Sequence, residues 1–136
     1  MVFAKARIKV KRTVRIENRL KPTQKFAWII SVAVGAAIWA LSPVLTGHVE
    51  PWDGNFEVFA MSLVIVSLSL GIKFPNQVFV SSSGVFLGQL GYMVFVLQTG
   101  PLIIVGVAFL LGYTMVFCLP FAFLGTFVRT KWYSSK

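Results

Sequence analysis

One short segment of the chain gathers side chains that could bind a metal ion or do acid–base chemistry. His48, Glu50, Asp53 and Glu57 fall within ten residues. Imidazole and carboxylate groups together are a plausible ligand set for a divalent cation. Their spacing matches no metal motif, and a catalytic metal site also needs a protected cleft and supporting hydrogen bonds. We keep His48, Glu50 and Asp53 as weak metal candidates and expect this turn to have a structural or docking role.

A second set of residues is suited to packing helices together. Ser81, Gly84, Gly88 and Gly91 recur every three or four residues, so on a helix they form one stripe of small side chains. Gly84 and Gly88 have the G-x-x-x-G spacing that lets two helix backbones approach closely in lipid. The neighbouring Gln89 carries an amide that needs a partner in hydrocarbon. We expect a helix contact here, within the chain or with a neighbour, and a serine, threonine or tyrosine hydroxyl as the partner of Gln89.

The positive charges gather at the N-terminus. Residues 1–25 hold nine of the thirteen Lys and Arg residues, against one acid, Glu17. Beside a membrane, such an arm attracts anionic lipid headgroups, and an acidic protein partner is the alternative. The arm lacks interleaved aromatic residues for stacking on bases, so a nucleic-acid partner is not expected. The residues expected to contact anionic lipid or a partner are Lys5, Arg7, Lys9, Lys11, Arg12, Arg15 and Arg19.

Long apolar segments indicate that membrane-spanning helices position these residues. Residues 74–128 contain no Asp, Glu, Lys, Arg or His, and hydrophobic residues make up 57% of the chain. A helix needs about 20 residues to cross the hydrocarbon core, so this run is long enough for two spans. Polar turns, glycine and proline divide the chain further. The predicted spans are 26–45, 56–72, 78–97 and 102–127, the last tilted or kinked at Pro120.

The distribution of charge predicts how these spans are threaded. All thirteen Lys and Arg residues lie in the arm 1–25, at Lys73 or in the tail 129–136, whereas the loops 46–55 and 98–101 have none. The first set should face the cytoplasm. We therefore predict an all-α integral membrane protein, an antiparallel four-helix transmembrane bundle with both termini cytoplasmic. The five-residue turn after the second span makes the second and third spans antiparallel neighbours, and no repeat of 20–50 residues is recognised.

The spans lack the groups that several membrane functions require. No charged residue or histidine lies in the middle of a span, which disfavours proton pumping and ion relays. The single histidine cannot supply two axial haem ligands, and Cys118 has no partner for an internal disulfide. The sequence therefore names no cofactor.

These observations favour a small non-catalytic subunit or assembly factor of a larger membrane complex, and not an enzyme. Its expected partners are anionic lipids and other membrane subunits. One alternative is a homo-oligomeric channel or small-solute transporter, lined by Ser81–Ser83, Gln89 and Thr114. A second is a membrane enzyme that uses His48, Glu50 and Asp53. A bacterial-type inner or plasma membrane is the expected location, with a thylakoid or other organelle membrane left open.

Overall fold

The described part of the chain is helical. This computed structural model describes residues 22–97 and 103–134, and every regular element in those ranges is a helix. The elements are α2 (Pro22–Thr46), α3 (Pro51–Gly54), α4 (Phe56–Lys73), α5 (Val78–Phe95), α6 (Ile103–Tyr113), the π-helix η1 (Thr114–Cys118) and α7 (Leu119–Ser134). Within these ranges, α2, α4, α5 and the continuous stretch Ile103–Trp132 are long and apolar enough to cross a membrane. The fold is that of a multi-pass membrane protein.

The observed helices differ from the predicted spans mainly at their ends. The first helix begins at Pro22, four residues inside the predicted arm, because proline suits the first helical turn, where its missing N–H is not needed. It ends at Thr46 and is followed by Gly47, whose φ of 75° is a conformation that glycine adopts without strain. Helix α7 continues to Ser134, through most of the predicted tail. The short α3 was not predicted.

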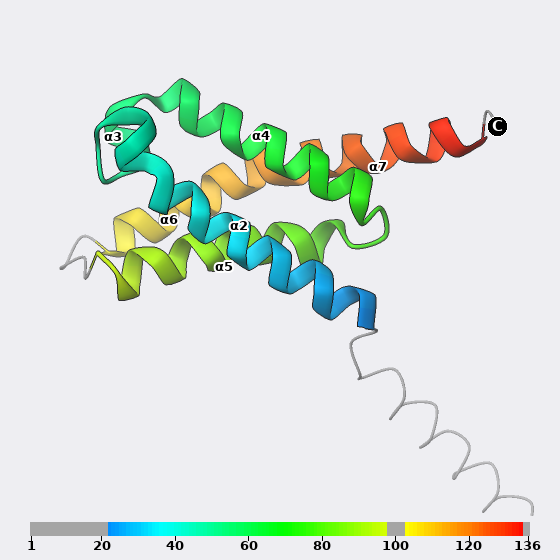
Figure 1. Ribbon diagram of the computed structural model, residues 1–136, viewed down its shortest axis with the longest axis horizontal. Helices are drawn as coiled ribbons and strands as arrows, with labels where there is room; N and C mark the ends of the chain where they lie inside the picture. The colour runs from blue at the N-terminus through cyan, green and yellow to red at the C-terminus, as the bar shows by residue number, and fades with distance from the viewer. Residues whose placement is uncertain (1–21, 98–102, 135–136) are drawn as a thin grey trace, which may run out of the picture.

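The proline in the last span is accommodated by a π-helix. The Leu119 N–H bonds to the Thr114 carbonyl oxygen, five residues back and not four, so the turn at η1 is wider than that of an α-helix. Pro120 has no N–H and its ring would clash with the carbonyl four residues before it in a regular helix. Widening the turn just before Pro120 lets α6, η1 and α7 continue as one long helix (Figure 1). The predicted disturbance at Pro120 therefore takes the form of a π-helical turn.

The main packing partners are not consecutive in sequence. The most extensive contacts join α2 to α5 and α4 to α7. In Figure 1 the two helices of each pair run in the same direction. Helices α4 and α5 are antiparallel and joined by a short turn, as predicted, but the contact between them is minor. Each close pair is therefore parallel and joins the first half of the chain to the second.

Glycine brings α2 and α5 into backbone contact. A Cβ atom at Gly35 would overlap the Val85 carbonyl oxygen, and one at Gly88 would overlap the Val32 carbonyl oxygen. Helix–helix association in lipid depends on such close van der Waals packing, because lipid tails are as apolar as the side chains.

The same arrangement joins α4 to α7. A Cβ atom at Gly71 would overlap the Ala122 carbonyl oxygen, and one at Gly125 would overlap the Leu68 carbonyl oxygen. In both pairs, each glycine contacts a carbonyl group of the partner helix. The residue that carries this carbonyl lies three positions before the partner helix's own glycine. Neither Gly71 nor Gly125 was predicted to make a helix contact.

The contacting glycines recur at nearly the same spacing in the two pairs, which indicates an internal repeat. Gly88 lies 53 positions after Gly35, and Gly125 lies 54 positions after Gly71, so equivalent residues contact each other across each pair. Identical residues recur at the spacing of 53 in Pro22/Pro75, Gln24/Gln77, Phe26/Phe79, Val32/Val85, Gly35/Gly88, Thr46/Thr99 and Gly47/Gly100. The glycine contacts of each pair are therefore reciprocal, and the identities fall in residues 22–47 and 75–100. The repeat was not predicted from the sequence, because its spacing exceeds 50 residues and few residues are identical between the two copies.

The two ends of the molecule carry opposite charge. Helices α2 and α5 begin, and α4 and α7 end, at one end (Figure 1), which bears Lys25, Lys73, Arg129 and Lys131. The other end holds α3 and the start of α4, with Glu50, Asp53 and Glu57. We call them the basic end and the acidic end.

Candidate functional site

The three weak metal candidates His48, Glu50 and Asp53 lie at the acidic end. His48 and Asp53 are exposed and Glu50 is half-buried. Within residues 22–97 and 103–134, no three His, Cys, Asp or Glu side chains lie where they could hold one metal ion.

Hydrogen bonds fix the backbone of this segment. Ser42 Oγ donates to the His48 carbonyl oxygen at 2.9 Å, which ties the turn to the end of α2. Asn55 Oδ1 accepts from the backbone N–H groups of Glu57 at 3.1 Å and Val58 at 3.4 Å, and so caps α4. The geometry is that of a folded connection between α2 and α4.

The basic arm cannot be placed in the same way. Its candidate residues Lys5, Arg7, Lys9, Lys11, Arg12, Arg15 and Arg19 lie outside the described residues. The predicted break at 98–101 also lies outside them.

Three of the four residues in the predicted small-residue stripe are buried. Gly88 contacts α2 as described, and a Cβ atom at Gly84 would lie 2.6 Å from the Ser31 Cβ atom. Ser81 is buried one turn before Gly84. A Cβ atom at Gly91 would meet no atom within 4 Å, so Gly91 lies outside the close contact.

Gln89 faces α2 and bonds to a residue that the sequence analysis did not consider. Trp39 Nε1 donates to Gln89 Oε1 at 3.2 Å, and both side chains are almost fully buried. The rings of Trp39 and Tyr92 lie 6.3 Å apart, and these two residues are equivalent in the repeat. The expected hydroxyl partner was wrong. An indole N–H is a donor that must find an acceptor in an apolar environment, and that requirement could have identified Trp39.

The residues proposed to line a channel do not share one face. Ser81 and Ser82 are buried, whereas Ser83 is exposed and bonds to the Val80 carbonyl oxygen at 3.0 Å. Thr114 is buried and bonds to the Leu110 carbonyl oxygen at 2.8 Å within its own helix. Gln89 is used in the α2 contact. Within one copy of the chain these side chains therefore point in several directions.

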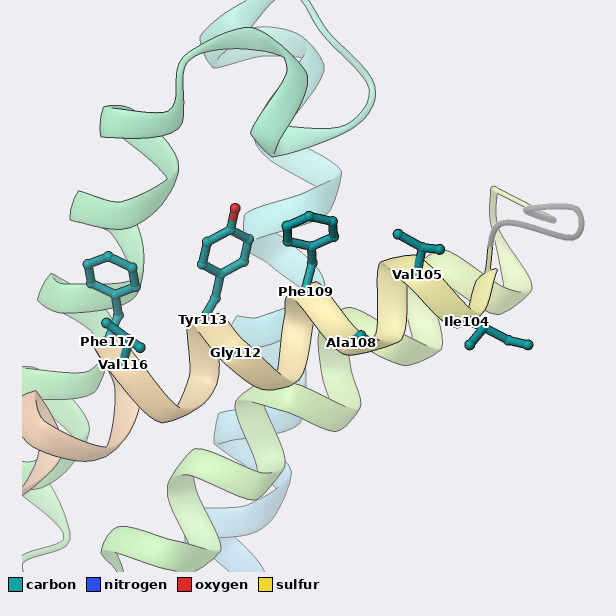
Figure 2. A pocket seen from close by; sticks show the side chains of 8 residues that line it. All are labelled: Ile104, Val105, Ala108, Phe109, Gly112, Tyr113, Val116 and Phe117. Atoms are coloured by element: carbon teal, nitrogen blue, oxygen red, sulfur yellow. The ribbon is translucent and has the colours of Figure 1, made fainter.

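A groove along α6 was not predicted from the sequence. It has a volume of about 610 Å³ and lies on the face of α6 and η1 shown in Figure 2. Its lining residues are Ile104, Val105, Ala108, Phe109, Gly112, Tyr113, Val116 and Phe117. The Tyr113 hydroxyl is the only polar side-chain group among them (Figure 2). The groove is therefore suited to an apolar ligand or helix.

Aromatic side chains border the groove on one side. The Tyr113 ring lies 5.5 Å from the Phe59 ring and 5.7 Å from the Phe56 ring, both on α4. In Figure 2, Phe109, Tyr113 and Phe117 point in one common direction from α6 and η1. The Phe56 and Phe59 rings pack against Tyr113 and so hold this border of the groove in place.

The other side of the groove is built from small residues. Ala108 and Gly112 are four residues apart, so they lie on the same face of α6. A Cβ atom at Gly112 would meet no atom within 4 Å. The small-x-x-x-small spacing of Ala108 and Gly112 was the signal in the sequence for this surface.

Comparison with known proteins identifies no relative whose function could explain this site. No family model, curated protein or solved structure matches the chain.

Proposed function

We propose that this chain is a small non-catalytic membrane subunit that stabilises or assembles a larger membrane complex. In this proposal the α6 groove receives a transmembrane helix of a partner subunit. The groove carries the proposal, since it is apolar, about 610 Å³ in volume and faces the surroundings of the bundle.

The use of glycine elsewhere in the fold supports a helix as the occupant. Gly35, Gly71, Gly88 and Gly125 each lie where another helix backbone approaches. A glycine inside a helix costs about 1 kcal/mol relative to alanine, and close packing offsets that cost at these four positions. Gly112 has no such neighbour within the described chain, and with Ala108 it would let a partner helix approach closely.

The orientation is also part of this proposal. We place the basic end, with both termini, on the cytoplasmic side, and four crossings are consistent with that placement. Reporter fusions should show the ends of the chain, residues 1 and 136, both in the cytoplasm, and a reporter inserted after His48 on the opposite side. Termini on opposite faces would overturn the threading.

The groove is tested by the variant Gly112→Leu, whose side chain would fill it. We expect the variant to be as thermally stable as wild type in mild detergent, because the site has open space, but to lose its partner during purification. A photo-crosslinking residue at Ile104, in the groove, should then join the partner's helix in wild type and fail to do so in the variant.

Two controls make this result specific. Gly91→Leu adds the same side chain at another open glycine and should keep the partner. A crosslinker at Ile65, exposed on α4 outside the groove, should not reach it. Equal crosslinking from both positions, or retention of the partner by Gly112→Leu, would rule out the groove as the docking site.

The internal repeat favours one second candidate, a homo-oligomeric channel or small-solute carrier. Parallel repeats related by an axis along the membrane normal occur in some transporters, with the substrate site between the repeats. Here Gln89 and Trp39 lie between the repeats, but they bond to each other beside the close Gly35 and Gly88 contacts. Mass spectrometry of the mildly solubilised protein distinguishes the two candidates: copies of this chain alone favour the carrier, and an unrelated subunit favours our proposal.

A further inference from the structure

A second pocket lies at the basic end, between the last turns of α4 and α7. Its volume is about 580 Å³, and it is lined by Ile72, Lys73, Val128, Arg129 and Trp132. The first two residues end α4, and the other three belong to α7. The pocket is therefore part cationic, part apolar and part aromatic.

Hydrogen bonds across the pocket hold one of the cations in place. Arg129 Nη1 donates to the Ile72 carbonyl oxygen at 2.7 Å and to the Lys73 carbonyl oxygen at 2.8 Å. These carbonyls are at the C-terminus of α4, where the partial negative charge of the helix also favours a cation. The guanidinium is thus fixed beside the exposed Lys73 side chain.

The acidic residues in the described ranges lie at the opposite end of the molecule from this pocket. Glu50, Asp53 and Glu57 all lie at the acidic end. The pocket therefore lies in a region of positive potential, which attracts an anion.

We propose that this pocket binds the headgroup of an anionic phospholipid. Lys73 and Arg129 contact the phosphate, and an acyl chain lies along Ile72 and Val128. Trp132 stands at headgroup level, where tryptophan is enriched in membrane proteins. Basic pockets between helix ends at the cytoplasmic face are suited to such headgroups. The site is separate from the α6 groove, because the two share no lining residue.

The test uses the full-length protein in mild detergent and native mass spectrometry. Phosphatidylglycerol is titrated in, with phosphatidylcholine as the neutral lipid and glycerol 3-phosphate as the free anion. We expect phosphatidylglycerol to bind wild type more tightly than phosphatidylcholine does, and glycerol 3-phosphate not to displace it. Loss of the Lys73 charge in Lys73→Gln should weaken phosphatidylglycerol binding about fivefold, and Lys73→Arg should restore it.

Lys131→Gln is the matched control. Lys131 is nearby on α7 but does not line the pocket, and its Nζ lies 5.1 Å from the centre of the Phe127 ring. The control removes the same charge and should bind phosphatidylglycerol as wild type does. Equal losses in Lys73→Gln and Lys131→Gln would mean diffuse attraction without a site, and displacement by glycerol 3-phosphate would mean a site for free anions. Either result would overturn the proposal.

Discussion

Replacing Gly88 by leucine is expected to destabilise the protein by about 3 kcal/mol or more, because overpacking of a tight contact costs this much when neither side can yield. The first added atom would overlap the Val32 carbonyl oxygen and would lie 2.9 Å from the Ala36 nitrogen. Both belong to the backbone of α2, so relief requires the two helices to separate. Thermal unfolding in mild detergent, followed by circular dichroism, measures the loss as a lower midpoint.

Gly91→Leu is the control for this experiment. It adds the same side chain to the same helix, less than one turn away, at a position with open space. Its unfolding midpoint should stay close to that of wild type. If both variants unfolded alike, the loss would come from packing of the larger side chain in detergent and not from the contact with α2, because leucine favours a helix more than glycine does.

Gly125→Leu should have an effect of similar size on the second close pair. The added Cβ atom would overlap the Leu68 carbonyl oxygen and would lie 2.9 Å from the Ile72 nitrogen, so α7 would have to move away from α4. This contact also positions Thr126 Oγ1, 3.0 Å from the Pro75 carbonyl oxygen, and Arg129 at the end of α4. We expect a loss of about 3 kcal/mol, measured by the same unfolding experiment.

The matched control for this variant is Gly112→Leu, in the same continuous helix but at a position with open space. It should leave the stability of the isolated protein unchanged. A cysteine pair that bridges α4 and α7 near Gly71 should form a disulfide in this control and form it more slowly in Gly125→Leu. Unchanged stability and crosslinking in Gly125→Leu would show that the close approach of α4 and α7 does not form in the protein.

The predicted helices were nearly complete because lipid imposes a simple rule on the sequence. Charged residues are costly in hydrocarbon, so the uncharged run from residue 74 to residue 128 marks two spans directly. The predicted ends of the helices were wrong where a helix continues beyond the uncharged residues. Pro22 can begin a helix among polar residues, and α7 continues through Arg129 and Lys131 into the predicted tail.

The candidate site was predicted less completely, because a small residue does not show whether its side of the helix faces another helix. Gly84, Gly88 and Gly91 look alike in the sequence, but Gly84 and Gly88 contact α2 and Gly91 does not. Gly112 was missed although it has the same spacing from Ala108 that Gly88 has from Gly84. Trp39 was missed as the partner of Gln89 because a residue 50 positions away cannot be assigned from spacing alone.

By itself, the sequence determined that this is an all-helical, multi-pass membrane protein. The reason is that a backbone in lipid must satisfy its own hydrogen bonds, and charges must stay near water. Only the tertiary structure decided that α2 pairs with α5 and α4 with α7. It also decided which glycines contact another helix, and where the α6 groove and the basic pocket lie. In lipid there is no apolar face to be hidden from water, so the choice of partners rests on the fit of one helix surface to another, which appears only when the helices are brought together.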